Sequence, residues 1–473
     1  MRPYVPPDGS IPTLPVPDLS GLRRVHLMGI AGAGMSGIAH LLLDRGFAVS
    51  GCDLKGSTGL NALRARGAEI AVGHDPAHHA GVDAVVISSA IRPGDAELAA
   101  AREAGIPVLH RAQVLAALAG TERSVAVAGT HGKTTTTSML AVALVAAGLD
   151  PTYVIGGELN ESGSNARSGT GGVFVAEADE SDGSFLLMRP SIGVVTNVEA
   201  DHLDFFGTLE EVEAAFAAFC ARCDHLVACG DDPGTRRVLA LAGREATTYG
   251  EKDDNDVVLH IGELGPEASG RVRIGAEEID LRLRVPGRHC LLNATAAVAV
   301  VAALGGSAAE AAAALAGFRG VRRRFEHRSS IGGARVVDDY AHHPSEIEAT
   351  LAAAATERPE RMVAVFQPHR YSRTAALGRE LGRSLAAADV VVVTDVYAAG
   401  EHPVPGVSGK MVVDGLVEAA PGKRAIYLPS RADVAPFVAR ELRRGDLILT
   451  LGAGDVTMVG EEVVRHVGGE DRG

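Results

Sequence analysis

The chain contains no tryptophan, and aromatic residues make up only 4% of its 473 residues. Alanine, valine, leucine and glycine are abundant instead, and hydrophobic residues account for 46% of the chain, which is ample for packed cores. Small apolar side chains let helices pack closely on parallel strands. The composition therefore favours layered α/β domains.

Cysteine is scarce as well. Five cysteines, unevenly spaced, are too few for a disulfide framework, so we expect a reducing, cytoplasmic environment. Cys220, Cys223, His225 and Cys229 have part of a zinc-site pattern, but no second pair follows at zinc-site spacing. We interpret Cys220 and Cys223, which lie on an apolar helical pattern, as small buried hydrophobic residues.

The sequence also lacks long apolar runs and an excess of basic residues. No run of about 18 uncharged apolar residues occurs, so no membrane span is expected. The net charge of −14 argues against a nucleic-acid or anionic-membrane surface, which needs clustered Lys and Arg. Residues 1–20 lack a basic region followed by an apolar one, and we interpret them as a short disordered or surface-bound arm rather than a secretory signal.

The length predicts about three domains of roughly 150 residues each. Strand patterns alternate with helical patterns in three segments, which is typical of parallel, doubly wound sheets. Short alternating strands at 253–285 indicate an antiparallel part in the middle segment. The predicted ranges are 1–20 for the arm and 21–120, 121–324 and 325–473 for the domains. Strands are expected at 24–29, 48–52, 84–87, 124–129, 173–176, 192–196, 334–337, 362–366, 390–394 and 447–451, and helices at 210–220 and 346–356.

The strongest motif is GTHGKTT at 129–135, directly after an apolar strand and before an apolar helix. Glycines let backbone amides curl around phosphates, and a helix N-terminus adds partial positive charge. Lys133 can reach the β- and γ-phosphates, and the Thr134 hydroxyl is placed to bind Mg²⁺. Val127 stands where the first glycine of the general pattern would be, but the strand–loop–helix context still indicates an ATP site. The ATP-binding candidates here are Gly129, Thr130, His131, Gly132, Lys133, Thr134 and Thr135.

Two acidic groups follow strands of the same segment, at 177–182 and 201–204. The carboxyl ends of parallel strands share one edge, where the phosphate loop also lies. Carboxylates gathered there repel one another unless a cation lies between them, so we expect magnesium with ATP. The alternative for each acid taken singly is a helix cap or a solvated loop. His202 would also suit zinc, but beside a phosphate loop Mg²⁺ is favoured.

The glycine-rich run at 29–37 follows a strand and opens a helix, and Asp53 ends the next strand. Gly32, Gly34 and Gly37 fit a dinucleotide fingerprint. Because NAD and a UDP-sugar both present a diphosphate, an NAD-dependent oxidoreductase is an alternative at this point. With an ATP loop in the same chain, a nucleotide-linked substrate is favoured.

The third segment holds DDYAHHP at 338–344 and QPHRYSR at 367–373, each after a strand. Arg370 and Arg373 can present bidentate forks to a carboxylate, as a bound amino acid requires. Arginines on surface helices are common, but the strand at 362–366 leads straight into this motif and favours a site at the strand end.

Taken together, these motifs resemble those of the Mur ligases, and among them the branch that joins L-alanine to UDP-N-acetylmuramate. The resemblance covers nearly the whole chain. Further motifs that carry it are SSAI at 88–91, EADESDGSFL at 177–186, TNVEADHLD at 196–204, RRF at 323–325, DVYAAGE at 395–401 and GAGD at 452–455. It implies three domains: a UDP-binding Rossmann-like domain, a central P-loop ATPase domain with a mainly parallel sheet, and a C-terminal Rossmann-like domain that receives the amino acid.

The resemblance also implies roles for single residues. Lys133 is similar to the γ-phosphate lysine, and His202 and His342 are both candidates for removing the amine proton. The implied magnesium ligands are Thr134, Glu177 and His202. The implied contacts to the UDP substrate are Gly32, Gly34, Met35, Ser36, Gly37, Asp53, Ser88 and Ser89. The implied contacts to the amino acid are Arg324, Tyr340, His342, Arg370 and Arg373.

Two departures bear on these roles. His289 and Asn293 resemble the base-binding segment HNxxN, but Cys290 replaces its asparagine. Sister ligases of later steps use a carbamylated lysine, whereas no lysine occurs here from Phe205 to Glu251. The alanine-adding branch is similar in lacking it.

The implied activity is ATP- and Mg²⁺-dependent ligation of L-alanine to UDP-N-acetylmuramate through an acyl phosphate, in peptidoglycan synthesis. A recycling ligase that adds a whole tripeptide to the same sugar shares this architecture and is an alternative. A non-catalytic nucleotide-binding regulator is another. We expect a monomer or homodimer with no nucleic-acid partner and no membrane insertion.

Overall fold

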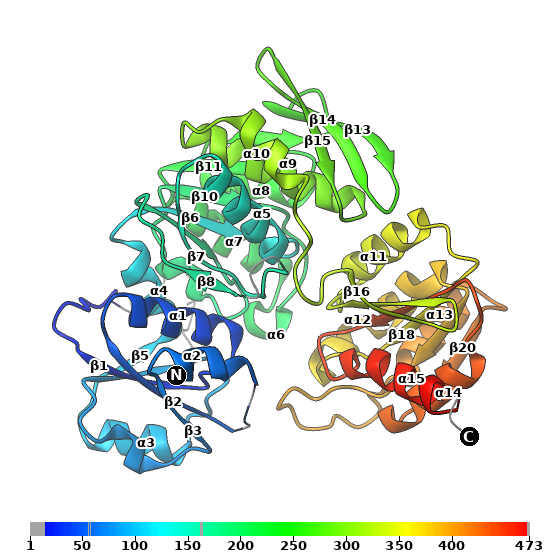
Figure 1. The fold of residues 1–473 in the computed structure, drawn as a ribbon, viewed down its shortest axis with the longest axis horizontal. Helices are drawn as coiled ribbons and strands as arrows, with labels where there is room; N and C mark the ends of the chain where they lie inside the picture. Colours follow the sequence, from blue (N-terminus) through cyan, green and yellow to red (C-terminus); the bar gives the residue numbers. More distant parts are fainter. Residues whose placement is uncertain (1–14, 55, 57, 161–163, 471–473) are drawn as a thin grey trace. The chain divides into compact units, whose positions relative to one another are not determined.

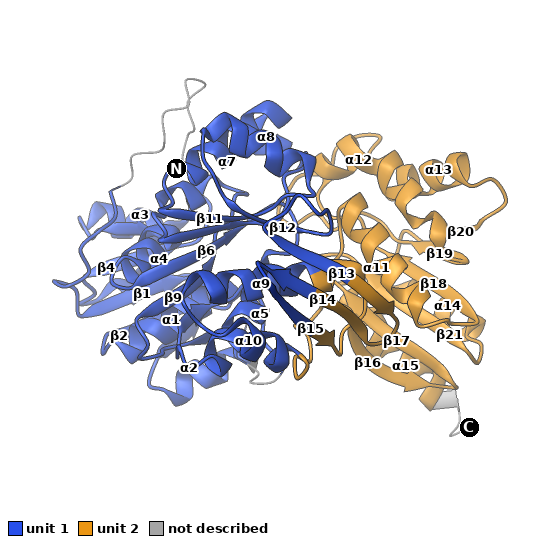
Figure 2. Ribbon diagram, turned by 90° about the horizontal axis from the view of Figure 1, so that it is seen from above, with its two compact units in different colours: residues 1–260, 272–280, 292–315 blue, residues 261–271, 281–291, 316–473 orange. Residues whose placement is uncertain are grey.

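The computed structural model describes residues 15–470 apart from 55, 57 and 161–163. Most of the arm predicted at 1–20 lies outside the described residues. The chain divides into two compact units, of which unit 1 holds residues 1–260, 272–280 and 292–315 and unit 2 holds 261–271, 281–291 and 316–473 (Figure 2). The three predicted domain ranges stay a prediction.

The first sheet of unit 1 has five parallel strands in the order β3-β2-β1-β4-β5 (Figure 1). The expected strands at 24–29, 48–52 and 84–87 appear with ends shifted by at most one residue. The strands are β1 (Arg24–Met28), β2 (Ala48–Asp53), β3 (Glu69–Val72), β4 (Ala84–Ile87) and β5 (Val108–His110). The helices are α1 (Ala33–Asp44), η1 (Thr58–Leu60), α2 (Asn61–Ala65), η2 (Pro76–His79), α3 (Ala96–Glu103) and α4 (Arg111–Ala119).

The second sheet has ten strands in the order β15-β14-β13-β12-β11-β10-β6-β9-β7-β8. Strands β10, β6 and β9 are parallel neighbours, so the loops that follow them meet at one edge. The strands are β6 (Arg123–Ala128), β7 (Thr152–Val154), β8 (Ala166–Arg167), β9 (Val173–Glu177), β10 (Ile192–Val195), β11 (His225–Cys229), β12 (Thr247–Gly250), β13 (Val257–Leu264), β14 (Ala268–Ile274) and β15 (Glu277–Leu283). The helices are α5 (Lys133–Ala146), η3 (Ser184–Leu187), α6 (Leu203–Phe206), α7 (Leu209–Cys220), α8 (Pro233–Ala242), α9 (Arg288–Ala303) and α10 (Ala308–Leu315).

Strands β13–β15 correspond to the antiparallel part expected at 253–285. Their connections are only a few residues long, and such short connections join antiparallel neighbours. Residues of these strands and of α9 are divided between the two units.

One hydrophobic core serves both sheets of unit 1. Ile38 of α1 and Val114 of α4 belong to the same buried cluster as Val154 of β7 and Phe185 of η3. The predicted boundary near residue 120 therefore separates two sheets that share a core.

Unit 2 contains a six-stranded sheet in the order β16-β17-β21-β18-β19-β20, in which β16 is antiparallel to β17 and the other pairs are parallel. The strands are β16 (Glu326–Ile331), β17 (Ala334–Asp339), β18 (Arg361–Phe366), β19 (Val390–Val393), β20 (Arg424–Tyr427) and β21 (Asp446–Leu451). The helices are α11 (Pro344–Thr356), α12 (Tyr371–Ser384), η4 (Leu385–Ala387), α13 (Lys410–Ala419), η5 (Arg431–Asp433), α14 (Val434–Glu441) and α15 (Thr457–Glu470).

The structure confirms the predicted α/β class with mainly parallel sheets. Within the described part of the chain, no helix is long and apolar enough to span a bilayer. Cys220 and Cys223 are buried in the apolar core, as predicted.

Candidate active site

The phosphate loop connects β6 to α5 in a backbone conformation that requires glycine. Gly129 has φ +138°, and a Cβ at this position would lie 1.9 Å from Thr196 Oγ1. Gly132, with φ +82°, caps α5, and a Cβ there would lie 2.9 Å from Asn293 Oδ1. The first helical bond of α5 runs from Thr136 N to Gly132 O. The amides of Lys133, Thr134 and Thr135 thus precede the helical ladder, as in an anion site at a helix N-terminus.

Lys133 is held among oxygen atoms at this loop. Its Nζ donates to Gly129 O at 2.6 Å and to Glu180 Oε1 and Oε2 at 2.8 and 2.7 Å. Burial opposes its charge, but the carboxylates of Glu180, Asp179 and Glu177 together outweigh burial and raise the pKa of Lys133. Burial raises the pKa of Glu180 to about 7 even though Lys133 favours the ionised form. Lys133 is therefore a cation with a carboxylate partner at the loop.

Two of the three predicted magnesium ligands lie together. Thr134 Oγ1 donates to Glu177 Oε2 at 3.2 Å, and Glu177 Oε1 accepts from Gly156 N at 2.6 Å. A hydroxyl and a carboxylate beside a phosphate loop form an oxygen donor set that suits Mg²⁺. His202, which has φ +54° at the start of α6, lies near other acids, with Nε2 3.7 Å from Glu180 Oε1 and 3.5 Å from Asp201 Oδ2.

The loop after β10 supports the phosphate loop through contacts that the sequence did not indicate. Asn197 Oδ1 accepts from His131 N at 2.8 Å, and Asn197 O accepts from Thr130 N at 2.9 Å. Thr196 Oγ1 donates to His131 O at 2.6 Å. Residues 196 and 197 lie within a motif noted for its acids, and only the structure shows that these two residues support Thr130 and His131.

The three residues of the proposed base segment lie on α9. Asn293 is next to Gly132 in unit 1, as its approach to that glycine shows. Burial and the nearby Arg324 lower the pKa of His289 to about 4, which keeps its ring neutral. Cys290 is buried, and burial raises the pKa of its thiol to about 12. A thiol that is both buried and protonated cannot replace an asparagine amide as a polar contact.

The glycine-rich loop between β1 and α1 is fixed by the neighbouring strand. Gly29 N and Ile30 N donate to Cys52 O at 2.8 and 3.1 Å, and Ala31 N donates to Asp53 Oδ2 at 3.1 Å. Asp53 thus positions the backbone of the loop that holds Gly32 and Gly34.

Other predicted UDP contacts surround the start of α1. Asn165 Nδ2 donates to Ser36 Oγ at 3.1 Å and to Ala33 O at 2.6 Å. A Cβ on Gly37 would lie 2.8 Å from Val154 Cγ1, so this glycine allows close packing on β7. The Met35 side chain is buried in the core, which leaves only its backbone to face a ligand. Ser88 and Ser89 follow β4 at the carboxyl edge of the sheet.

Arg111 is a charged residue that sequence reasoning missed. It begins α4 directly after β5, and its Nη1 would lie 3.1 Å from a Cβ on Gly34. Its Nη2 lies 2.7 Å from Asp179 Oδ2. The guanidinium therefore lies between the glycine-rich loop and the acidic group that follows β9. In the sequence, Arg111 is a single arginine after a short apolar run and belongs to no motif, so nothing marked it as a site residue.

In unit 2 the predicted amino-acid contacts gather after β17. Arg324 and Tyr340 stack, with the guanidinium carbon 5.1 Å from the ring centroid. His342 packs edge-to-face against Tyr340, and its Nδ1 lies 3.3 Å from Glu346 Oε2. Arg324 Nη1 lies 3.7 Å from the same carboxylate, at Oε1.

Positive charge converges on the loop after β18. Burial, the neighbouring His342 and the guanidinium groups of Arg373, Arg370 and Arg323 lower the pKa of His369 to about 3. Arg370 caps α12 with φ +68°, and Arg373 lies in the first turn of that helix. The motif contained His369, but only the structure shows that its ring lies against His342 and Tyr397 and near these guanidinium groups. Arg370 and Arg373 present two guanidinium groups beside a neutral histidine, and paired guanidinium groups suit a carboxylate ligand.

Comparison with protein-family models agrees with this arrangement. Residues 24–123 match the model "Mur ligase family, catalytic domain", residues 127–301 match "Mur ligase middle domain" and residues 323–454 match "Mur ligase, glutamate ligase domain". The chain belongs to the Mur ligase family.

Individual Mur ligases are similar over nearly the full chain. The UDP-N-acetylmuramate–L-alanine ligase of Kineococcus radiotolerans is 51% identical over 462 residues, covering 95% of this chain and 97% of its own. That of Mycolicibacterium smegmatis is 50% identical over 467 residues, covering 94% and 95%.

Among solved structures, the UDP-N-acetylmuramate–alanine ligase of Thermotoga maritima matches with TM-score 0.80 at 30% identity, covering 94% of this chain and 99% of that one. A murein peptide ligase from Psychrobacter arcticus matches with TM-score 0.71 at 25% identity, covering 95% and 99%.

Proposed function

We propose that this Mur ligase joins L-alanine to the lactyl carboxylate of UDP-N-acetylmuramate in peptidoglycan synthesis, with ATP and Mg²⁺. The observation that carries the proposal is the phosphate loop, where Lys133, Thr134 and Glu177 surround one helix N-terminus. It is supported by identities of about half the residues to alanine-adding ligases. Cytoplasmic location and a monomeric or homodimeric state belong to the same proposal.

ATP supplies the phosphoryl group that turns the lactyl carboxylate into an acyl phosphate, releasing ADP. The first-turn amides of α5 and Lys133 bind the phosphates and offset the charge that develops during transfer. Lys133 already has an oxygen partner in Glu180, so a phosphate oxygen shares or replaces that carboxylate. Thr134 and Glu177, with His202, are the ligands we propose for Mg²⁺, which lowers the repulsion between phosphates and the incoming carboxylate.

The α-amine of L-alanine then attacks the acyl carbon, and phosphate leaves. Arg370 and Arg373 bind the amino-acid carboxylate, and Arg324 and Tyr340 complete that site. His202 and His342 are the two candidates to accept the amine proton. His342 is the one whose neighbours also include the amino-acid site.

Phosphate release from ATP and UDP-N-acetylmuramate, with each amino acid added in turn, tests the proposal. We expect release to require both UDP-N-acetylmuramate and L-alanine. Lys133→Ala should abolish turnover while binding of the UDP substrate persists. Release without the amino-acid requirement, or no affinity for ATP with magnesium, would refute the assignment.

The recycling ligase is the second candidate, because a murein peptide ligase shares the fold over nearly the whole chain. Its acceptor is a tripeptide, so direct competition between L-alanine and the tripeptide separates the two. Preference for the tripeptide would replace the first proposal by the second.

A further inference from the structure

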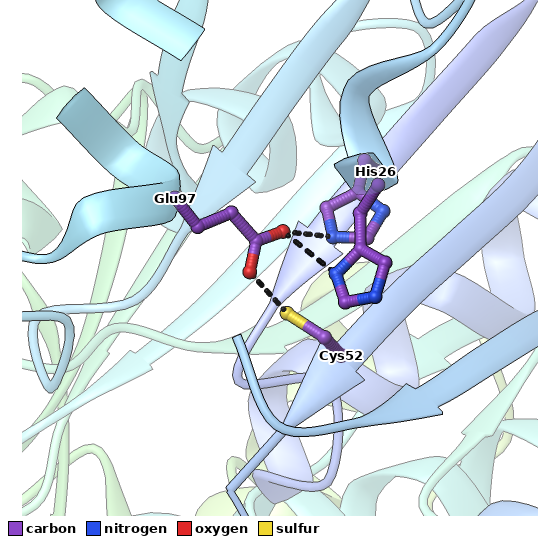
Figure 3. A group of neighbouring side chains, drawn as sticks. His26, Cys52 and Glu97 are labelled. Carbon is purple, nitrogen blue, oxygen red and sulfur yellow. Dashed lines mark hydrogen bonds and ion pairs between the residues drawn. The ribbon is translucent and has the colours of Figure 1, made fainter. Parts of the chain in front are cut away.

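A buried cluster of metal-type donors lies in the first sheet, away from the phosphate loop. It consists of His26 on β1, Cys52 on β2, His78 in η2 and Glu97 in the first turn of α3. Figure 3 shows His26 and Cys52 beside the Glu97 carboxylate. One ligand atom from each lies within 4.8 Å of every other. These four donors come from four separate segments, so their convergence is a property of the fold.

The contacts centre on the Glu97 carboxylate. His26 Nε2 lies 2.9 Å and His78 Nδ1 3.2 Å from Glu97 Oε1, while Cys52 Sγ lies 3.2 Å from Oε2. Glu97 and Cys52 are fully buried, and His26 is 1% exposed. A buried carboxylate and a buried thiol side by side are costly unless a proton or a cation lies between them.

The ring of His26 is oriented through its Nδ1 atom. His26 Nδ1 lies 2.9 Å from Ser50 Oγ, and the buried Nε2 faces the Glu97 carboxylate, 2.9 Å from Oε1. A ring held through one nitrogen, with the other turned toward a thiol and a carboxylate, is the usual arrangement of a metal-binding histidine.

We propose that His26, Cys52, His78 and Glu97 bind one Zn²⁺ ion. Sulfur, nitrogen and oxygen donors in a set of four match zinc, whereas Mg²⁺ prefers oxygen alone. The Cys52 thiol loses its proton to solvent on binding, and the thiolate and carboxylate then balance the charge of the dication. His78 is 22% exposed and gives the ion a path from solvent.

The zinc would hold the strands that position the UDP loop. The Cys52 carbonyl accepts the hydrogen bonds from Gly29 and Ile30, and a bound ion would tie this strand to β1 and α3. The inference does not depend on the ligase activity, because its readouts are metal content and spectra.

The first experiment measures metal in the nucleotide-free full-length protein, purified without chelator after growth with zinc. We expect one zinc per chain by mass spectrometry of the metal. In Co²⁺-substituted protein we expect a thiolate-to-cobalt charge-transfer band. Cys52→Ala should remove that band and weaken zinc binding at least about tenfold. Cys229→Ala, which removes a buried thiol on β11 outside the cluster, should leave both unchanged.

His78→Gln keeps the test informative if Cys52→Ala fails to fold, since His78 is the most exposed of the four. It should weaken zinc binding while the circular dichroism spectrum stays that of the parent protein. A protein without stoichiometric zinc, or zinc that survives both substitutions without a thiolate band, would overturn the proposal and leave a metal-free polar cluster.

Discussion

Replacing Arg111 tests the role of the positive charge next to the glycine-rich loop. Arg111→Ala should weaken binding of UDP-N-acetylmuramate by about 10- to 100-fold, the range expected when one charge-assisted hydrogen bond is lost. Isothermal titration without ATP measures this directly. Arg102→Ala, which removes an exposed arginine on α3, is the matched control and should bind normally. Unchanged affinity in Arg111→Ala would show that the guanidinium serves only Asp179.

The sequence indicates candidate residues that belong to a motif and misses those that do not. Lys133, Thr134 and Glu177 could be proposed because strand, loop and acid follow one another in a fixed order, and the structure places Thr134 beside Glu177. Arg111 could not be proposed, since its position depends on β5 ending next to Gly34, which only the packed sheet reveals. The same holds for the zinc-type cluster, whose members are spread over 26–97 without a spacing rule.

Replacing Arg373 tests the proposed amino-acid site. It is one of the cations near the neutral His369, so Arg373→Ala should raise the KM for L-alanine by about 10- to 100-fold through loss of a carboxylate contact. The KM for ATP should change less than about twofold, because the substitution removes a contact to L-alanine and none to ATP. Arg383→Ala, in the last turn of the same helix, is the control. Equal effects on both KM values would contradict the assignment.

At the scale of elements, the strands that were predicted agree closely with the structure because their buried apolar runs are short and bounded by turns. Strands such as β3, β5 and β20, which have only partly buried residues or lie at the edge of a sheet, were not predicted. Helix α7 begins one residue before its predicted start because Thr208 and Glu211 form a capping box there. The sharing of one core by the first two sheets was not predicted. It arises from contacts between α1, α4 and β7, which no local pattern encodes.

Helix α5 offers a matched pair of glycines at its two ends. Gly129→Ala, just before the helix, places Cβ 1.9 Å from Thr196 Oγ1 and should displace the loop. We expect loss of ATP binding, measured by nucleotide titration, with the UDP substrate still bound. Gly148→Ala, just after the helix, has φ +72° and no atom within 4 Å of the added Cβ. It should cost only about 1 kcal/mol of stability through backbone strain and leave ATP affinity unchanged. Normal ATP binding by Gly129→Ala would mean that the loop conformation is not needed.

For the whole molecule, the division of the buried cores predicts which parts unfold together. The core of unit 1 joins both of its sheets. The two hydrophobic clusters on the faces of the six-stranded sheet contain only residues of unit 2. Leu118→Ala in α4 and Leu351→Ala in α11 remove equivalent buried side chains, one from each core. Each should cost about 2–5 kcal/mol, because it leaves a cavity.

Amide hydrogen exchange, measured segment by segment in both variants, shows which strands lose protection together. Leu118→Ala should speed exchange in β1 and β2 and also in β6 and β9, because a shared core makes the two sheets one cooperative unit. Strands β18 and β21 should keep their protection in that variant. Leu351→Ala should give the reverse pattern. If Leu118→Ala loosened the first sheet alone, the two sheets of unit 1 would be separate folding units in spite of their common core, and the boundary predicted near residue 120 would also be an energetic one.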